Sequence, residues 1–507
     1  MKIRAISVLI LLLIVQVAVG QAPEPDFDQY VEKAMKEWEV PGLAIAIVKD
    51  DRIVFAKGYG VRELGGTAAV NEHTLFAIGS ASKAFTAATV ALLVDEKKLK
   101  WDDPVTKYLP AFQLFDPYST REMTVRDLLT HRSGLERGDL LWYASPYDRN
   151  EVLRRVRFLK PSWSVRSRFG YQNIMFLAAG QISPALTGKE WDDVVHERIF
   201  VPLGMNSSST SIKKFAGLDN VASPHSKIDD KLQKVAWRNV DNIGPAGSIN
   251  SNVVDMAQWL RLNLGGGMYE NKRILSAASV KEMQTPQTII RIEGNNERLY
   301  PEAHFLSYGL GWFLSDFRGR KLVEHGGAID GMRAAVGMLP EEKLGVVILT
   351  NRNGSVLPHV LMYRVFDAYL GVPKRDWTSE LFKRFKAMED MAKAAEKKTE
   401  DERVKGTSPS LALEKYAGTY QNEMYGEAKF AMKDGKLTSE RGPYFHGDLE
   451  HWHYNTFRVV WRDQMGGKGF VNFRLNTKGQ PDSVSIDGLG EFTRVPDKPA
   501  PGAVSSN

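Results

Sequence analysis

Ser80 and Lys83 have the residue types and the spacing that nucleophilic catalysis requires. They stand three positions apart at the start of an Ala-rich stretch without Pro or Gly, which predicts a helix over 80–96. Residues three apart share one face of a helix, so the hydroxyl and the amine can meet. A hydroxyl needs a base near neutral pH, and a lysine amine can be that base when burial keeps it neutral. Since the first helical turn also stabilises a developing oxyanion, the pair indicates acyl transfer through Ser80.

Two further motifs follow at larger separations. Tyr171-x-Asn173 comes after a Phe-Gly turn, and His325-x-Gly327 ends a strand pattern before a second glycine turn at Gly331. Each motif is weak by itself, because Ser-x-x-Lys recurs at 211–214 and Tyr-x-Asn recurs at 269–271 and 420–422. The order and the settings of the three motifs favour one catalytic site.

The elements that must position these residues predict an α+β unit. A helix is expected over 26–39, helical patterns fill about 100–290, and another helix is expected over 357–370. Strand patterns lie at both ends of this segment, at 43–48, 53–56, 308–315, 321–325, 334–339 and 344–349. Strands at both ends with helices between them predict a single sheet assembled from the two ends.

The C-terminal part of the chain has a different character. A charged helical linker is predicted over 373–410, where the lysine and glutamate run reads as a solvated helix. Short strands flank turns at Asp434-Gly435 and Lys478-Gly479, which predicts a small all-β, barrel-like domain over 411–496. The Pro/Gly/Ser-rich segment 497–507 is expected to be a disordered tail.

The N-terminus predicts export. Lys2 and Arg4 precede an apolar run over 5–19, with small residues before a cleavage point near Gly20. This is typical of a signal peptide over 1–20, so we expect a periplasmic or extracellular protein with no stable membrane span in its mature form. The alternative is that the segment stays uncleaved as an anchor.

Composition excludes several classes of protein. The net charge is +6 over 507 residues, and no long Lys/Arg run is present, so nucleic acid is not expected as a partner. The chain has no cysteine, which rules out disulfides, thiolate zinc sites and a cysteine nucleophile. No cofactor and no metal site are expected.

Some aromatic and histidine side chains have competing interpretations. His131 is expected to be a structural histidine that hydrogen-bonds a loop, with a catalytic role as the less favoured alternative. His451 and His453 alternate on one strand face, where surface histidines are favoured over a metal site. Trp142 and Tyr143 could wall a substrate cleft or belong to the core.

Taken together, the three motifs resemble those of the serine β-lactamase and penicillin-binding-protein superfamily, in its class C-like branch. The resemblance covers about residues 26–372, and residues 411–496 resemble the lipocalin-like β domain appended to many such hydrolases. Supporting stretches lie at 76–80, 127–135, 199–205, 245–248 and 308–312. The resemblance implies an antiparallel sheet flanked by helices, a helical subdomain, and a small β-barrel.

The resemblance also implies roles for individual residues. Ser80 would be the acylated nucleophile, and Lys83 and Tyr171 would share its proton and pass it to the leaving group. Asn173 would orient Lys83 or the substrate amide. The backbone N–H groups of Ser80 and Ala328 would form the oxyanion hole.

One departure from the family pattern bears on the substrate. Lactamases of this branch carry a lysine where this chain has His325 in His325-x-Gly327. A histidine is mostly neutral at pH 7, whereas a lysine presents a fixed positive charge to a substrate carboxylate. The departure therefore favours the esterase, peptidase and amidase relatives over an efficient β-lactamase.

These observations predict an exported serine hydrolase that cleaves small esters, amides or D-amino-acid-containing peptides through an acyl-enzyme. The alternatives are a peptidoglycan DD-carboxypeptidase or penicillin-binding protein, a weak β-lactamase, and a non-catalytic sensor of cell-wall fragments. A homo-oligomer is a further expectation. The motifs define acylation machinery and leave the leaving group open.

Overall fold

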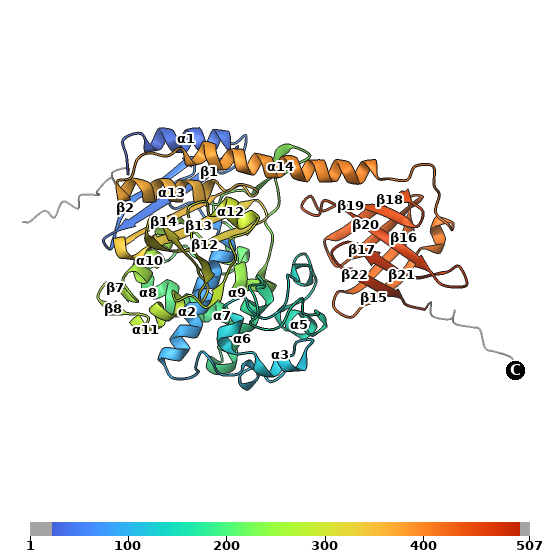
Figure 1. Ribbon diagram of the computed structural model, residues 1–507, viewed down its shortest axis with the longest axis horizontal. Coiled ribbons are helices and arrows are strands. Elements are labelled where there is room, and N and C mark those ends of the chain that lie inside the picture. Colours follow the sequence, from blue (N-terminus) through green and yellow to red (C-terminus); the bar gives the residue numbers. More distant parts are fainter. Residues whose placement is uncertain (1–22, 497–507) are drawn as a thin grey trace, which may run out of the picture.

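The computed structural model of the chain describes residues 23–496. It consists of a larger α+β unit and a β-barrel, which helix α14 (Trp377–Asp401) connects along one side of the molecule (Figure 1). The predicted signal peptide (1–20) and tail (497–507) lie outside the described residues. No helix within 23–496 has the length and apolar character that crossing a membrane requires.

An eight-stranded antiparallel sheet lies at the centre of the larger unit, in the order β2-β1-β14-β13-β12-β11-β10-β9. Its strands are β1 (Gly42–Lys49), β2 (Arg52–Gly60), β9 (Thr288–Ile289), β10 (Leu306–Tyr308), β11 (Phe313–Phe317), β12 (Arg320–Ile329), β13 (Met332–Leu339) and β14 (Leu344–Thr350). β1 and β14 come from opposite ends of the unit and pair along their whole lengths. The predicted α+β fold, with one sheet built from both ends, is therefore confirmed.

β12 is paired differently along its two halves. β11 pairs with its first half, from Arg320 to Glu324. β13 pairs with its second half, from Val323 to Ile329. Among the described residues, no strand of this sheet covers the β11 side of residues 325–329. The second half of β12 therefore presents a free strand edge, to which an extended ligand backbone can bind.

Helices cover both faces of the sheet. One face packs against α1 (Phe27–Glu37), α13 (Leu357–Leu370) and the first turns of α14. The other face packs against α2 (Ser82–Asp95), α10 (Val253–Leu264) and a helical subdomain. The remaining helices are α3 (Pro117–Glu122), α4 (Val125–Leu128), α5 (Arg149–Arg155), α6 (Asn173–Thr187), α7 (Trp191–Val195), α8 (Val201–Leu203), α9 (Gly244–Gly247), α11 (Ala277–Met283) and α12 (Asn295–Leu299). The central strands β1 and β14 are apolar along nearly their whole lengths because both of their faces are covered.

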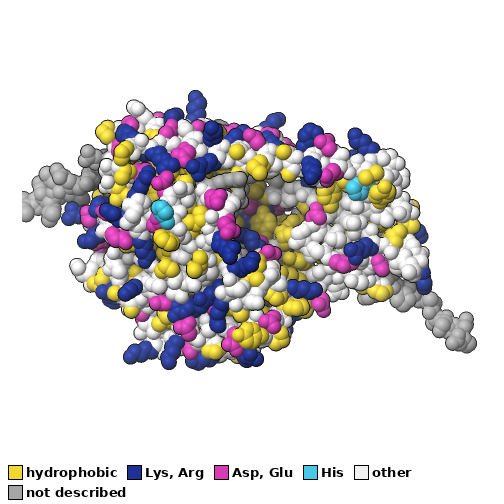
Figure 2. All heavy atoms as spheres, in the orientation of Figure 1, with side chains coloured by type: hydrophobic (Ala, Val, Ile, Leu, Met, Phe, Trp, Pro, Cys, Tyr) yellow, Lys and Arg dark blue, Asp and Glu magenta, His cyan; other side chains and the backbone are white. Residues whose placement is uncertain are grey.

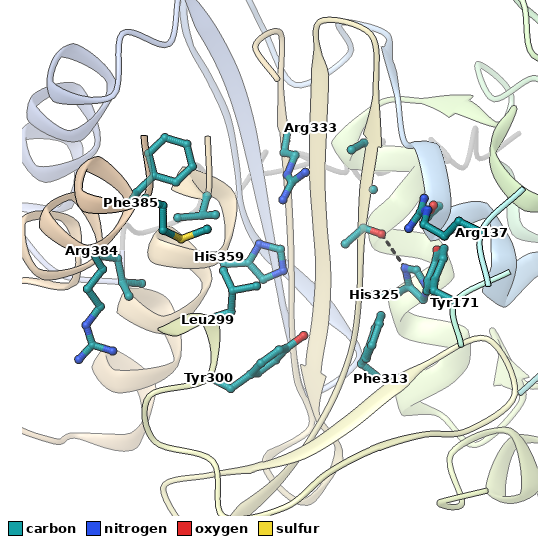
Figure 3. A pocket seen from close by; sticks show the side chains of 17 residues that line it. Arg137, Tyr171, Leu299, Tyr300, Phe313, His325, Arg333, His359, Arg384 and Phe385 are labelled. Carbon is teal, nitrogen blue, oxygen red and sulfur yellow. Dashed lines mark hydrogen bonds between the residues drawn. The ribbon is translucent and has the colours of Figure 1, made fainter. Parts of the chain in front are cut away.

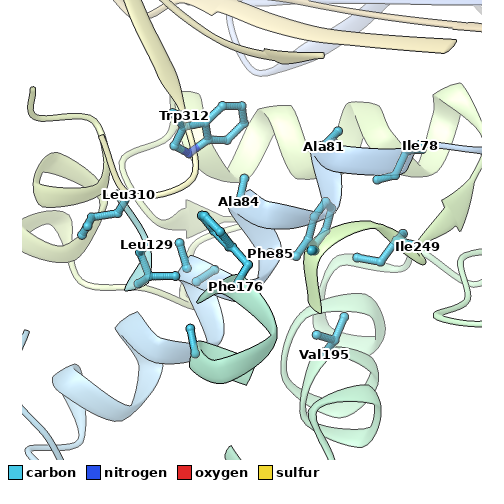
Figure 4. Packing of buried hydrophobic residues seen from close by; sticks show 14 of the residues in the cluster. Ile78, Ala81, Ala84, Phe85, Leu129, Phe176, Val195, Ile249, Leu310 and Trp312 are labelled. Carbon is cyan, nitrogen blue, oxygen red and sulfur yellow. The ribbon is translucent and has the colours of Figure 1, made fainter. Parts of the chain in front are cut away.

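Helix α2 is the core of the helical side. All of its residues from Ser82 to Leu93 are buried, as expected for a helix that is apolar on every side. Phe85 on α2 stacks on Trp259 with ring centroids 4.0 Å apart, and Trp312 lies nearly parallel to Trp259 with ring centroids 6.5 Å apart. Phe176 and Trp312 lie beside the first turns of α2 in Figure 4, so the segment that follows Ser80 is packed on more than one side.

The structure corrects three local expectations. The strand expected over 308–315 is two strands, β10 and β11, because residues 309–312 turn against α2; a Cβ on Gly311 (φ +80°) would lie 2.8 Å from the Lys83 carbonyl oxygen. His325 lies inside β12, since the strand continues through the two glycines that follow. Ser80 belongs to a 3₁₀ turn, Gly79–Ala81, and α2 begins after it at Ser82.

The C-terminal unit is a closed barrel of eight antiparallel strands, which confirms the predicted barrel. Its strands are β15 (Gly418–Asn422), β16 (Gly426–Lys433), β17 (Lys436–Arg441), β18 (Phe445–His453), β19 (Thr456–Trp461), β20 (Lys468–Leu475), β21 (Pro481–Ile486) and β22 (Gly490–Arg494). Alternate residues of the strands fill the interior, where Phe430, Phe473 and Phe457 pack edge to face around Tyr420 and Tyr416. Closure leaves this sheet without an edge.

The barrel contacts a segment of the larger unit between α4 and α5, which we call the docking segment (137–149). Tyr147 Oη donates to the Tyr425 carbonyl oxygen at 2.9 Å, and Arg441 Nη2 donates to the Leu140 carbonyl oxygen at 3.0 Å. Met424 of the barrel is buried in the core of the larger unit. Figure 2 shows that the surface is hollowed below α14, between the two units, with hydrophobic side chains inside the hollow.

Candidate active site

A close approach of two backbone segments places Ser80 beside β12. A Cβ on Gly327 would lie 1.7 Å from the Ile78 carbonyl oxygen, and a Cβ on Gly79 (φ +50°) would lie 2.7 Å from the Ala328 nitrogen. Any side chain at Gly327 would therefore force the two segments apart. This contact gives a physical reason for the glycine in the His-x-Gly motif.

Lys83 projects from the first turn of α2 toward Ser80. Its Nζ lies 3.1 Å from Ser80 Oγ, 2.7 Å from Asn173 Oδ1 and 2.8 Å from the Ala246 carbonyl oxygen. The side chain is fully buried, and burial lowers the pKa of its amine well below the usual lysine value. A neutral amine has two N–H groups and one lone pair. Because Asn173 Oδ1 and the Ala246 carbonyl only accept, two N–H groups of the amine face them, and in the neutral amine this leaves the lone pair for the Ser80 hydroxyl.

Asn173 is held in one orientation by a carboxylate. Its Nδ2 donates to Asp139 Oδ1 at 2.8 Å, which directs Oδ1 toward Lys83. Trp142 Nε1 donates to the same Asp139 oxygen at 2.9 Å. Asp139 belongs to the docking segment, so this segment reaches from the barrel to the Lys83 environment.

Tyr171 lies beside Lys83, whose Nζ is 4.8 Å from the centre of the Tyr171 ring. Burial raises the pKa of its phenol above the usual range, and the hydrogen bond between Tyr171 and Ser80 opposes that rise only in part. Tyr171 is therefore a neutral phenol at neutral pH. His131 packs 4.1 Å from the Tyr171 ring and accepts the Gln172 backbone N–H at its Nδ1. The structural interpretation of His131 agrees with these contacts.

His325 lines the same cavity, but both of its ring nitrogens have other partners. Nδ1 lies 2.6 Å from the Gly326 carbonyl oxygen, which only accepts, so Nδ1 carries the hydrogen. Nε2 then accepts from the Tyr308 hydroxyl at 2.9 Å. Burial, the neighbouring Lys83 and His359 lower the pKa of His325 to about 3, so the ring is neutral.

A cavity of about 350 Å³ opens beside Ser80 and continues around the free edge of β12. Ser80, Tyr171, His325 and residues 326–328 line one side. The far side is lined by the residues labelled on the left and in the centre of Figure 3, which come from the end of α12 and from β13, α13 and α14. The lining includes three arginines and two histidines, and none of the described residues that line it is acidic. This volume is in the range of small-molecule sites.

The sequence motifs place one side of this cavity and miss the other. Ser80, Lys83, Tyr171, Asn173, His325, Gly327 and Ala328 all lie at or next to it. The motifs give no indication of Arg137, Tyr300, Arg333, His359 or the α14 residues. One signal was present: Leu381, Phe385 and Met388 are spaced four and three apart within the charged linker, which is the pattern of an apolar helix face.

Other predicted residues lie elsewhere. Trp142 and Tyr143 do not line the cavity; Tyr143 donates to Asp330 at 2.8 Å, near the barrel. A β-bulge separates His451 from His453. No group of three potential metal ligands occurs within residues 23–496.

Comparisons with known proteins agree with this architecture. A family model described as beta-lactamase matches residues 27–369, and one described as a domain of unknown function (DUF3471) matches residues 402–497. The unguisins hydrolase ungD of Aspergillus violaceofuscus is 30% identical over 463 residues, covering 83% of this chain and 80% of the relative. Penicillin-binding protein 4 of Amycolatopsis lactamdurans is 29% identical over 325 residues, covering 62% of this chain and 82% of the relative. Among solved structures, the octameric penicillin-binding protein homologue from Pyrococcus abyssi has the same fold, with a TM-score of 0.62, 22% identity, and coverage of 92% of this chain and 99% of that one.

Proposed function

The chain belongs to the beta-lactamase family, and on that premise we propose that it is a serine hydrolase that works through an acyl-enzyme on Ser80. The observation that carries the proposal is the buried Lys83 amine 3.1 Å from Ser80 Oγ, which also contacts Asn173 Oδ1 and the Ala246 carbonyl oxygen and whose pKa is lowered by burial. This arrangement leaves the lone pair for the serine proton. A base held in this way is what an unactivated hydroxyl needs to attack a carbonyl.

The proton follows a short path in this mechanism. Ser80 Oγ attacks the carbonyl carbon while Lys83 Nζ takes the hydroxyl proton, and the oxyanion forms near the backbone N–H groups of Ser80 and Ala328. Tyr171, a neutral phenol, delivers a proton to the leaving oxygen or nitrogen and is re-protonated from Lys83. Water then attacks the acyl-enzyme by the same path in reverse, which releases a carboxylic acid and restores Ser80.

The substrate class follows from the charge near β12. With His325 neutral, the His325-x-Gly327 motif offers no fixed positive charge, so small esters, amides or D-amino-acid-containing peptides are the proposed substrates and lactams are poor ones. Because one relative is named penicillin-binding protein 4, a DD-carboxypeptidase is the alternative function. We also propose export after cleavage near Gly20.

Labelling of Ser80 tests the proposal. The mature protein is treated with a fluorophosphonate, weighed by intact mass spectrometry, and assayed on a series of p-nitrophenyl acyl esters. We expect one label per chain and ester turnover, both lost in Ser80→Ala. A folded wild-type protein with neither label nor turnover would favour the sensor alternative. Stoichiometric, slowly reversed labelling by penicillin would favour the DD-carboxypeptidase.

A further inference from the structure

Arg333 is a charged side chain with no counter-charge. It lies on β13 directly opposite Ala328 and lines the cavity that contains Ser80. Its Nε is shielded from solvent and has no hydrogen-bond partner, and its guanidinium forms no ion pair with any residue in 23–496. Figure 3 shows the guanidinium directed into the cavity, on the side where His359 lies. Arg333 is only partly exposed, and removing much of a charge from water without a partner is costly, so this position favours an external anion.

The other two arginines of the cavity are already paired. Arg137 Nε donates to Asp139 Oδ2 at 2.7 Å, and Arg384 Nη2 donates to Glu380 Oε1 at 2.7 Å. Each of these arginines therefore has a carboxylate partner, and Glu380 also accepts from Arg375. Arg333 is therefore the cavity arginine whose charge is available to a ligand.

A buried carboxylate on the same face does not serve Arg333. Glu324 is 1% exposed and lies two residues before Gly326 on β12. Its Oε2 is 3.2 Å from Nε2 of His359, and it forms no ion pair with Arg333. Tyr300 lies close enough to interact electrostatically with Arg333, but a phenol is neutral and cannot balance the charge.

The route from Ser80 to Arg333 is continuous. Residues 326–328 on the free edge of β12 line this cavity together with Ser80 and Arg333. The apolar side chains of Leu381, Phe385 and Met388 form its wall on α14. A ligand that reaches both ends therefore needs a reactive carbonyl at Ser80, an apolar body, and a negative group at Arg333.

We propose that Arg333 binds a carboxylate of the substrate, so that the preferred substrates are anionic acyl compounds or peptides in place of neutral esters. This inference rests on the proposed acyl-enzyme at Ser80. The planar guanidinium presents parallel N–H donors that match a carboxylate in a bidentate hydrogen-bonded pair. The α14 wall makes the linker helix part of the specificity site.

Matched substrate pairs test the proposal. The first pair is p-nitrophenyl hydrogen glutarate and p-nitrophenyl hexanoate, with the charge on the acyl side. The second is N-acetyl-D-alanyl-D-alanine and its C-terminal amide, with the charge on the leaving group. The preference is the ratio of kcat/KM for the anionic member to that for the neutral member. We expect a wild-type preference for the anion in at least one pair, and Arg333→Met to lower it about 10- to 100-fold, the contribution of a hydrogen-bonded charge.

Arg384→Met is the matched control, because it removes an arginine from the same cavity that already has a partner. We expect it to keep the wild-type preference within about threefold, and Arg333→Lys to keep part of it. A competition experiment on the wild-type protein needs no variant. Glutarate should inhibit the hydrolysis of p-nitrophenyl hexanoate at a lower concentration than the neutral glutaramide does. The proposal is overturned if the wild-type protein shows no anion preference although Ser80 is still labelled. It is also overturned if Arg384→Met loses the preference and Arg333→Met keeps it. Loss of Ser80 labelling in the wild type would instead refute the proposed function.

Discussion

The protonation state of Lys83 decides which group can activate Ser80. Burial removes the amine from water and lowers its pKa, while Asp139 opposes this shift and Arg137 adds to it. Tyr171 shows the opposite response, because burial raises the pKa of its phenol. The two pKa shifts therefore favour the states expected of a base and of a proton donor, an unprotonated Lys83 and a protonated Tyr171.

Replacement of Lys83 tests this assignment. Lys83→Met removes the base, so we expect kcat/KM on a p-nitrophenyl ester to fall about 100-fold or more, which is the usual contribution of a general base. In the wild type only the unprotonated amine is active, so kcat/KM should fall as the pH drops through the lowered pKa, and this acid limb should lie below the ordinary lysine value.

Lys83→Arg separates a base from a cation. Arginine keeps a positive charge and cannot lose its proton at accessible pH. We expect this variant to be as inactive as Lys83→Met. Substantial activity in Lys83→Arg would show that the charge at this position matters and would contradict the role as a base.

At the scale of elements, the docking segment connects the barrel to the catalytic residues. Asp139 accepts from Asn173 and from Trp142, and the same segment contacts the barrel through Tyr147. The orientation of the Asn173 amide, and with it the direction of the Lys83 lone pair, depends on this carboxylate. The docking segment thus couples the barrel to the site.

Asp139→Asn should shift the pH profile. The Asp139 charge raises the pKa of Lys83, so its removal makes the protonated amine less stable and lowers that pKa further. We expect the acid limb of kcat/KM to move to lower pH, and kcat/KM on the plateau to fall about tenfold if Asn173 turns its amide, a loss comparable to one charged hydrogen bond. The measurement is a pH–rate profile of both proteins.

Asp148→Asn is the control for this change, since it removes a carboxylate from the same segment. Asp148 caps α5 by accepting the Glu151 backbone N–H, and asparagine caps helices equally well. This variant should keep the wild-type profile. An acid limb that moves upward in Asp139→Asn, or equally in both variants, would contradict the argument.

The same elements show how far the sequence predicts the structure. Apolar runs and turn residues predict β1, β14, α13 and the barrel hairpins, because burial on both faces and Asp-Gly or Lys-Gly turns leave a local pattern. The turn at 309–312 and the strand interior around His325 were predicted wrongly, since the packing of Gly311 on α2 and of Gly327 on Ile78 involves residues far apart in the chain. Arg333 could not be singled out for the same reason: its missing counter-charge is a property of the folded neighbourhood.

At the scale of the whole molecule, one arginine joins the two units. Arg238 Nε lies 2.7 Å from Asp330 Oδ2, in the turn between β12 and β13, and its Nη2 lies 2.8 Å from Asp463 Oδ2 of the barrel. The guanidinium also packs over Tyr143 and Tyr444. The barrel is therefore attached both to the docking segment and to the hairpin that carries residues 325–333, so its position can affect both sides of the cavity.

Arg238→Met should weaken this attachment strongly. The Arg238 side chain is only 7% exposed, and its loss leaves Asp330 (9% exposed) and Asp463 (17% exposed) without their counter-charge. Removing one partner of a buried ion pair costs about 3–5 kcal/mol, and the partial exposure of Asp463 places the expected loss near the lower value. Urea unfolding followed by intrinsic fluorescence measures this loss, and proteolysis within α14 reports separation of the barrel.

Arg462→Met is the control, because Arg462 pairs with Asp448 on the barrel surface at 50% and 42% exposure, where an ion pair contributes less than about 1 kcal/mol. Equal effects of the two substitutions would mean that Arg238 stabilises the barrel no more than a surface charge does.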